Sequence, residues 1–527
     1  MPAGGTVGAV AGRSLWQRHW PFLLILAGTL VIRLVVLVLG QTHVYRDEAV
    51  IGMMANRINE RSELPFYFEG QHYNAAGAWE AYLAAAAFKV FGMGVLPLKG
   101  CIMVLSLVWT TLLYRLADVV YGRRTALLAV IAFVLLPTML KWNFQVRGYS
   151  FYLIAVPTLA LLYWRLDSVA EPRSRYALLF GLACGITLWG LELGIPLVAA
   201  LWVLLAVRRR LAGVVLALAS GGFVIGYGPV LVYNLTHGFS NWQAVLFEKT
   251  SVQGWQELQS SPVWTTILFN ELPKFFGPDT TFFYFEKVPW LGWGFYVAAV
   301  AAAVLAVAPF LKSPLTVWRT FLHPEPDRAI NPDLLMLLLI AACSITYLTI
   351  KERTANYFLG SCFFISILIG RLLDRTLFSR GKALRFAGFA TLATVVFFGL
   401  AAVIRAASQD GVDTLLLTRH GFKMAHVPAE DIEGVHEQLR QLQADSCATG
   451  MFLVGTFTVE SGGRVATSDA TEPNSFWFPP GRNRIVFVLE TSSPYCDGVV
   501  DGARQAGLET VSTVHGMLTV IQVLKAR

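Results

Sequence analysis

The stretch PFLLILAGTLVIRLVVLVLGQTHVYRDEAVIGMMANRI, residues 21–58, joins two kinds of sequence that decide the fold. Its apolar first half, 21–40, is long enough to cross a hydrocarbon core about 30 Å thick. Because lipid offers the backbone no hydrogen-bond partners, such a run must form a helix. Asp47 and Glu48 then open a segment, 47–59, whose apolar side chains recur on one helical face: Val50, Ile51, Met54 and Ile58. This pattern predicts an amphipathic helix lying on the membrane surface.

Apolar runs of the same kind recur along the whole chain. Of its 527 residues, 55% are hydrophobic and 14% are charged, whereas soluble globular domains are about 25% charged. We therefore expect an all-α polytopic membrane bundle of about 11 transmembrane helices. The further runs are 97–118, 124–140, 149–164, 176–191, 194–207, 211–233, 290–311, 333–350, 357–373 and 386–405.

The basic residues follow the pattern of a membrane protein rather than of a nucleic-acid surface. The net charge is +8, and the positive side chains form short clusters in every second loop between apolar runs, as the positive-inside rule predicts. We therefore predict a cytoplasmic N-terminus, non-cytoplasmic loops at 41–96 and 234–289, and no nucleic-acid partner. The clusters are Arg123 and Arg124; Arg165, Arg173 and Arg175; Arg208, Arg209 and Arg210; Lys312, Arg319 and Arg328; and Arg371, Arg375, Arg380, Lys382 and Arg385.

The character of the chain changes after Arg405. Residues 1–405 are expected to form the membrane domain, whereas 410–527 alternate polar and apolar residues as soluble domains do. This second part predicts a small α/β domain of ordinary size on the non-cytoplasmic side. Its expected elements are a helix at 428–443 and strands at 451–459, 484–490 and 516–524.

Two of the six cysteines, Cys447 and Cys496, fall in this second domain. A non-cytoplasmic compartment is oxidising, so the placement predicts a disulfide between them. The alternative, two thiols in a reducing compartment, would require the inverted orientation. No CxxC or Cys/His cluster occurs in the sequence, which argues against a structural zinc site.

The carboxylates of Asp47 and Glu48 allow two interpretations. Acidic residues in the first turn of a helix favour the positive end of its dipole, which is a purely structural role. A carboxylate at the membrane–water boundary can instead act as a metal ligand or as a general base on an acceptor hydroxyl. The spacing does not separate these readings. Glu192, between two apolar runs, is similarly either a buried functional acid or a residue of a tight turn.

The first long loop carries a resemblance to a known family. The segments RDEAVIGMMANRI (46–58) and LPFYFEGQHYNAAGAWEAYLAAAAFKVFG (64–92) resemble the GT-C superfamily of membrane glycosyltransferases. They are most similar to its branch of protein O-mannosyltransferases and lipid A aminoarabinose transferases (bacterial glycosyltransferase family 39-like). The resemblance implies an enzyme of the bacterial inner membrane. It would move a sugar from a polyprenyl-phosphate carrier to a lipid, glycan or protein acceptor on the periplasmic side.

The same resemblance assigns roles to individual residues. Asp47 becomes the catalytic carboxylate, with Glu48 shaping or assisting it, and the substrate-binding positions become Gln71, Tyr73 and Glu80. Two basic, non-cytoplasmic segments become the site for the donor phosphate, because Arg is suited to bidentate phosphate binding. Their residues are Arg147, Tyr149, Lys351, Arg353 and Tyr357. The alternative for these cations is an anchor that contacts lipid headgroups.

One departure from the family concerns a metal. Several relatives carry a second Asp in the loop after the third span, but residues 141–149 contain no acid. A divalent cation, Mg or Mn, would need Asp47 with Glu80 or Glu69 as its ligands. We therefore expect a single displacement with inversion in which Asp47 acts as a base.

Two other classes of function compete with the enzyme. A transporter or flippase of a lipid-linked saccharide would place its ionisable groups near the bilayer midplane, often within inverted repeats. A scaffold that binds a partner through its C-terminal domain would not need so elaborate a first loop. The sequence shows no internal repeat and concentrates its acids in the non-cytoplasmic loops, which favours the enzyme.

Overall fold

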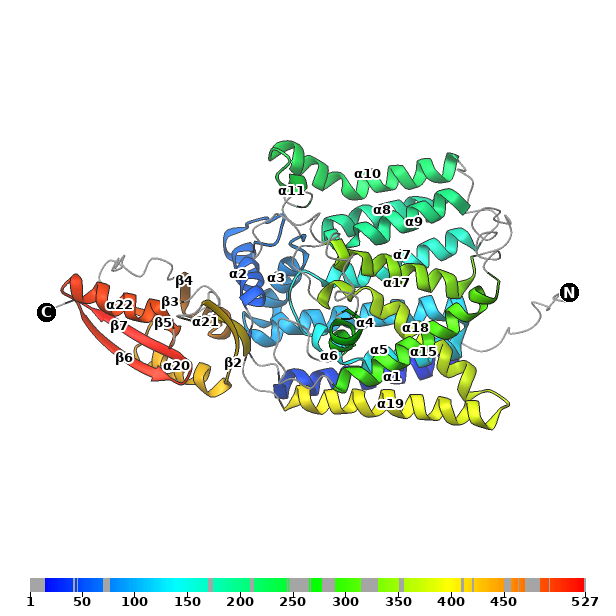
Figure 1. Cartoon of the computed structure of the whole chain (residues 1–527). Coiled ribbons are helices and arrows are strands. Elements are labelled where there is room, and N and C mark those ends of the chain that lie inside the picture. Colours follow the sequence, from blue (N-terminus) through cyan, green and yellow to red (C-terminus); the bar gives the residue numbers. More distant parts are fainter. Residues whose placement is uncertain are drawn as a thin grey trace.

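The computed structural model describes most of the chain, and the helices of residues 15–408 form one bundle (Figure 1). The described residues are 15–40, 43–44, 46–69, 76–168, 174–208, 213–243, 245, 265, 267–276, 290–313, 330–349, 355–408, 412–418, 421–449, 456–462, 464–469, 484–491 and 493–525. Every predicted apolar run coincides with a helix, except that 124–140 divides into two at Pro137. Proline ends a helix because it lacks the backbone N–H and its ring clashes with the preceding turn.

The bundle helices differ in length. They are α1 (Leu15–Gly40), α4 (Val95–Tyr121), α5 (Arg123–Leu135), α6 (Pro137–Trp142), α7 (Ser150–Asp167), α8 (Ser174–Gly190), α9 (Ile195–Arg208), α10 (Gly213–Thr236), α15 (Trp290–Lys312), α17 (Pro332–Thr349), α18 (Ser361–Leu377) and α19 (Lys382–Ala407). Five described segments are long and apolar enough to cross a membrane: His19–Leu39, Val95–Tyr121, Gly213–Thr236, Gly292–Lys312 and Lys382–Ala407. The fold is therefore that of a helical membrane protein.

Helices α8 and α10 pack unusually closely because glycines face backbone across their interface. A Cβ atom on Gly181 would overlap the carbonyl of Ala219, and one on Gly222 would overlap the carbonyl of Leu178. Small residues allow such approach between membrane helices, where packing replaces the hydrophobic effect as the driving force. The close contact fixes the ends of α8 and α10 relative to each other.

The first long loop contains two helices at one end of the bundle, α2 (Arg46–Arg61) and α3 (Trp79–Phe91), as Figure 1 shows. The predicted amphipathic helix is therefore present, with Ile51 and Met54 of its apolar face buried. This face packs on other protein segments in the common core of the bundle. Shorter elements near the same end are η1 (Glu192–Gly194), α11 (Ser240–Gln243), η3 (Ile267–Glu271), α14 (Leu272–Phe276) and η4 (Ala355–Phe358).

The C-terminal region folds as a small α/β unit. A hairpin of β1 (Val412–Thr418) and β2 (Gly421–Val427) precedes a five-stranded sheet with the order β4-β3-β5-β7-β6. Strand β3 is parallel to β4 and β5, whereas β7 is antiparallel to β5 and β6. The remaining elements are β3 (Ser446–Thr449), β4 (Ala466–Asp469), β5 (Arg484–Glu490), β6 (Glu509–His515), β7 (Leu518–Leu524), α20 (Ala429–Gln441), α21 (Thr456–Glu460) and α22 (Pro494–Gln505).

The secondary structure expected for this unit is partly confirmed. The helix at 428–443 and the strands at 484–490 and 516–524 correspond to α20, β5 and β7. The strand expected at 451–459 is wrong over its described part, because residues 456–460 form the helix α21. Residues 451–455 lie outside the described residues.

The predicted disulfide between Cys447 and Cys496 is wrong, because both described residues are thiols. Cys447 packs in the cluster on the α20 face of the sheet, whereas Cys496 packs against the cluster on the α22 face. Ala448, the residue after Cys447 in β3, belongs to the α22 face, and side chains of a strand alternate between the two faces. The sheet therefore separates the two sulfur atoms. The predicted orientation of the chain in the membrane then rests on the charge pattern alone.

Helix α21 joins this unit to the start of α2. Val459 is fully buried in the core of the bundle, and a Cβ atom on Gly52 of α2 would lie 2.6 Å from its Cγ2 atom. The carboxylate of Glu460 accepts the backbone N–H of Val44 at 2.9 Å. It also lies 3.3 Å from Nδ1 of His43 and 2.9 Å from Nε2 of His436. The C-terminal region therefore holds the backbone that leads into Asp47.

Burial by itself would raise the pKa of Glu460, because it disfavours the charged form. Hydrogen bonds and charge attraction from His43 and His436 outweigh burial and lower this pKa to about 2.

Candidate functional site

Three of the predicted acids converge on the buried loop between α6 and α7, residues 143–149. The carboxylates of Asp47 and Glu48 reach this loop from α2, and that of Glu80 reaches it from α3. The loop is ordered by protein contacts although it has no regular secondary structure. It therefore brings together segments that are far apart in the sequence.

Asp47 and Arg147 form an ion pair at this loop. Oδ2 of Asp47 lies 3.2 Å from Nη2 of Arg147, and the aspartate side chain is 25% exposed whereas the arginine side chain is 6% exposed. The residue predicted as the catalytic carboxylate thus contacts one predicted to bind phosphate. Asp47 is the member of the pair that an incoming substrate can reach.

Glu48 turns to a different partner. Its Oε2 lies 2.9 Å from Nζ of Lys99 on α4, and both side chains are 3% exposed. Its Oε1 also accepts the N–H of Val146 at 3.3 Å. Its carboxylate is thus buried against a lysine and holds α2, α4 and the loop together, and its predicted role beside Asp47 stays a prediction.

Lys99 was not among the predicted site residues, although the sequence contains a signal for it. A lysine within the apolar run 97–118 needs a partner, because an isolated charge in a membrane segment is costly. The sequence does not say which carboxylate supplies that partner.

Glu80 orders the backbone of the loop. Its two carboxylate oxygens accept the N–H groups of Gly148 and Ser150, each at 2.8 Å. Burial raises the pKa of Glu80, and hydrogen bonds from Ser150, Gly148 and Arg147 offset this in part. The carboxylate is thus turned to the residues flanking Arg147 and Tyr149, so its contacts support a positioning role and not the predicted contact with substrate.

Two predicted tyrosines lie close to this centre. Tyr149 packs with its ring centroid 4.8 Å from that of Trp142. Its electrostatic neighbours are Tyr357, Arg147, Glu192 and Asp47. The structure therefore places Tyr149 near Arg147, Tyr357 and Glu192, which stands in η1 at the end of α8. The phosphate-binding role of Arg147, Tyr149 and Tyr357 stays a prediction.

Four predicted site residues cannot be placed. Gln71, Tyr73, Lys351 and Arg353 lie outside the described residues.

The arrangement does not fit the divalent cation that the resemblance leaves open. Asp47 pairs with Arg147, and both oxygens of Glu80 are held by backbone N–H groups. Glu69 pairs with Arg57 at the far end of α2. Across the part of the chain that the structure describes, no group of three His, Cys, Asp or Glu side chains is placed to hold a metal ion. A cation at Asp47 would therefore share its carboxylate with Arg147.

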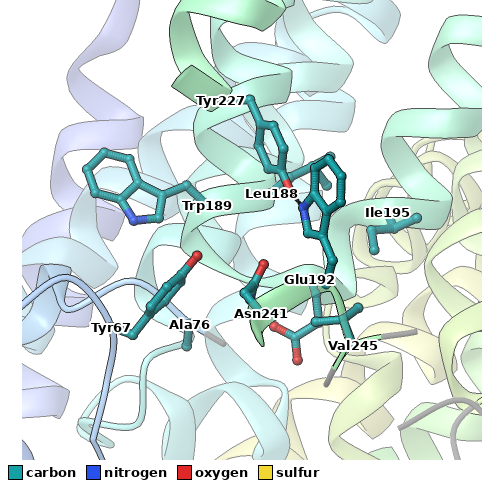
Figure 2. Close-up of a pocket in the computed structure, with 10 residues that line it drawn as sticks. Tyr67, Ala76, Leu188, Trp189, Glu192, Ile195, Tyr227, Asn241 and Val245 are labelled. Carbon is teal, nitrogen blue, oxygen red and sulfur yellow. Dashed lines mark hydrogen bonds between the residues drawn. The ribbon is translucent and has the colours of Figure 1, made fainter. Parts of the chain in front are cut away.

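A cavity of about 210 Å³ lies between the first loop and helices α8 to α11 (Figure 2). Four aromatic side chains line it together with an acid, an amide and apolar groups. The lining residues are Tyr67, Ala76, Leu188, Trp189, Glu192, Ile195, Tyr227, Asn241, Trp242 and Val245.

No protein-family model matches the chain, and no curated protein matches it by sequence. Solved structures do resemble its fold. The structure of ArnT from Cupriavidus metallidurans bound to undecaprenyl phosphate is similar with a TM-score of 0.59 and 13% identity, covering 96% of this chain and 98% of that one. The apo state of the same protein matches equally well. The Archaeoglobus fulgidus oligosaccharyltransferase in its apo form has a TM-score of 0.50 and 12% identity, covering 95% of this chain and 70% of that one.

Proposed function

We propose that this protein, which has the GT-C fold of those structures, is an inverting glycosyltransferase that uses a polyprenyl-phosphate-linked sugar as its donor. The observation that carries the proposal is the contact between Asp47 and Arg147 at the end of the membrane bundle. It combines a partly exposed carboxylate with a buried guanidinium, the two groups that this transfer requires. The binding of undecaprenyl phosphate by a protein of the same fold supports a lipid carrier.

The chemistry assigns one task to each partner. Asp47 accepts the proton of the acceptor nucleophile as that atom attacks the anomeric carbon. The bond from the anomeric carbon to the carrier phosphate breaks in the same step, with inversion. Arg147 offsets the charge that grows on the departing phosphate. A guanidinium has five N–H donors and can serve a carboxylate and a phosphate at once. Lys351, Arg353 and Tyr357 complete the phosphate site in this proposal.

The charge pattern supports the proposed setting of the reaction. With the basic clusters in the cytoplasm, α2, α3 and the second domain (410–527) lie on the periplasmic side of a bacterial inner membrane. The membrane domain (1–405) then carries the reaction, and the acceptor is a lipid, a glycan or a protein.

The test is the Asp47→Asn variant, compared with Glu60→Gln, which removes a charge from an exposed position of the same helix. Purified full-length protein would be incubated with radiolabelled polyprenyl-phosphate sugar and a cell-envelope acceptor fraction. We expect Asp47→Asn to lose transfer by about 10²- to 10⁴-fold, the usual contribution of a general base. Glu60→Gln should keep full activity. A folded Asp47→Asn variant with normal transfer would remove the proposal.

A further inference from the structure

The cavity beside η1 has walls from parts of the chain that are far apart in sequence. Figure 2 shows Tyr67 and Trp189 on one side of it, Tyr227 on another, and Asn241 and Glu192 between them. Its volume of about 210 Å³ is smaller than the pockets of about 300 to 1,000 Å³ that hold drug-sized ligands. The cavity therefore suits one small ring.

The lining selects for an uncharged ligand that carries hydroxyl groups. None of the ten described lining residues is Lys or Arg, and the acid Glu192 among them would repel a phosphate. An acid and an amide among the lining residues suit a ligand that carries hydroxyl groups better than an alkyl chain. The aromatic rings offer flat apolar faces that suit the C–H face of a sugar ring, while polar groups around them reach its hydroxyls.

Tyr67 supplies a second, independent observation. Its side chain is 7% exposed, yet its hydroxyl has no hydrogen-bond partner among the described residues. Nε1 of Trp189 is in the same situation within the described chain. Leaving a buried polar group without a partner costs about 1–3 kcal/mol. A ligand hydroxyl in the cavity that Tyr67 lines would give the hydroxyl of Tyr67 a partner.

The walls of the cavity are held in place by aromatic contacts. Trp189 stacks on Phe66 with ring centroids 4.9 Å apart and lies 4.2 Å from the ring of Trp79. On the other side, the indole N–H of Trp242 donates to the hydroxyl of Tyr227 at 2.9 Å.

A backbone hydrogen bond closes the side of the cavity formed by Ala76 and Trp189, where the N–H of Gly77 donates to the carbonyl of Gly190 at 3.2 Å. A site already formed before binding loses less entropy when its ligand enters.

The cavity adjoins the Asp47 centre through the loop between α6 and α7. Ala76, which lines the cavity, lies so close to Gly148 that a Cβ atom there would be 3.3 Å from its own Cβ. Gly148 directly follows Arg147, the partner of Asp47. The wall of the cavity at Ala76 therefore adjoins the loop that carries Arg147.

We propose that this cavity binds one monosaccharide ring of the donor or of the acceptor, with Glu192 and Tyr67 as its hydrogen-bonding residues. The proposal rests on the glycosyltransferase function for the sugar's role in the reaction. The binding itself does not depend on that function.

The binding test uses saturation-transfer NMR on the full-length protein in detergent. The probes are the methyl α-glycosides of D-mannose, D-glucose, D-galactose and L-arabinose. At least one should receive saturation from the protein through its ring C–H protons. Glu192→Gln should weaken binding by about 10- to 100-fold and Tyr67→Phe by about 2- to 10-fold. Tyr176→Phe, at the opposite end of α8, is the control and should bind normally.

The outcomes separate the two proposals. If no glycoside receives saturation, or if Glu192→Gln and Tyr67→Phe bind as the wild type does while remaining folded, the sugar site is overturned. Asp47→Asn should keep sugar binding. If it also keeps transfer, the proposed function fails while the sugar site stands.

The source of the ring is decided by kinetics. If the cavity holds the donor sugar, Tyr67→Phe should slow the release of sugar to water in the absence of acceptor. If it holds the acceptor, that release is unchanged and the KM for acceptor rises by about 2- to 10-fold. Normal release together with a normal acceptor KM would overturn the site.

Discussion

Asp47 and Glu48 are neighbours in the sequence, but the regions they enter differ. Asp47 reaches the rim of the loop between α6 and α7, where it is partly exposed and pairs with Arg147. Glu48 enters the space between α2 and α4, where it pairs with Lys99 away from solvent. Successive residues of a helix point about 100° apart, so one of two adjacent acids can face substrate while the other holds the helix. Role follows from burial and partner, not from residue type.

The largest expected effect on stability comes from breaking the buried pair. Lys99→Met should lower the free energy of unfolding by about 3–5 kcal/mol, because it leaves the charge of Glu48 buried without its lysine. The Glu48→Gln/Lys99→Met double variant should recover most of this loss. Thermal unfolding in detergent would measure both. If the double variant is no better than the single one, the pair does not have the proposed structural role.

Breaking the other pair should affect activity instead. Arg147→Ala should reduce transfer by about 10²- to 10³-fold, as loss of one charge-stabilising donor does. Its stability should change by less than that of Lys99→Met, because Asp47 is partly exposed and water can solvate it. Arg147→Lys should restore part of the activity. The check is kcat and KM for the donor alongside thermal unfolding, and a large fall in stability with unchanged kcat would reverse the comparison.

Glu460 sharpens the comparison, because it is buried like Glu48 but is held by histidines. Its pKa falls from 4.5 to about 2 on folding, so it contributes about 3 kcal/mol of stability above pH 4.5. That contribution is lost as the pH falls from 4.5 towards 2. Glu460→Gln should flatten the pH dependence of unfolding in this interval, measured by chemical denaturation at successive pH values. If the pH dependence of unfolding is unchanged in Glu460→Gln, the contacts of Glu460 with His43 and His436 do not contribute to stability as expected.

The smallest effect is expected at the packing contact between α2 and α21. Gly52→Ala should cost about 1–3 kcal/mol by overpacking, because the new methyl group meets Val459. Val459→Ala in the same chain should relieve part of that cost. A double-mutant cycle on unfolding free energies measures the coupling. If the changes in unfolding free energy from Gly52→Ala and Val459→Ala are strictly additive, the two positions are not in steric contact.

The candidate site shows how far sequence reasoning reached. It named Asp47, Arg147, Tyr149 and Tyr357 as site residues, and the structure places these four residues near one another. It did not foresee that both oxygens of Glu80 accept backbone N–H groups, because nothing in a linear sequence tells which groups a carboxylate turns to.

Two other features depend on contacts that form only in three dimensions. Lys99 was missed because its partner lies about fifty residues away in the chain. The disulfide failed because a sheet stands between Cys447 and Cys496.

The sequence by itself determined the membrane bundle and the order of its helices. Lipid leaves an apolar run of sufficient length no alternative to a helix, so composition and length are enough. Only the tertiary structure decided which of the two adjacent acids is partly exposed, where the C-terminal unit docks, and that Tyr67, Trp189 and Glu192 line one cavity. Those features depend on contacts between distant segments and on the direction of each side chain. No local rule of sequence encodes either one.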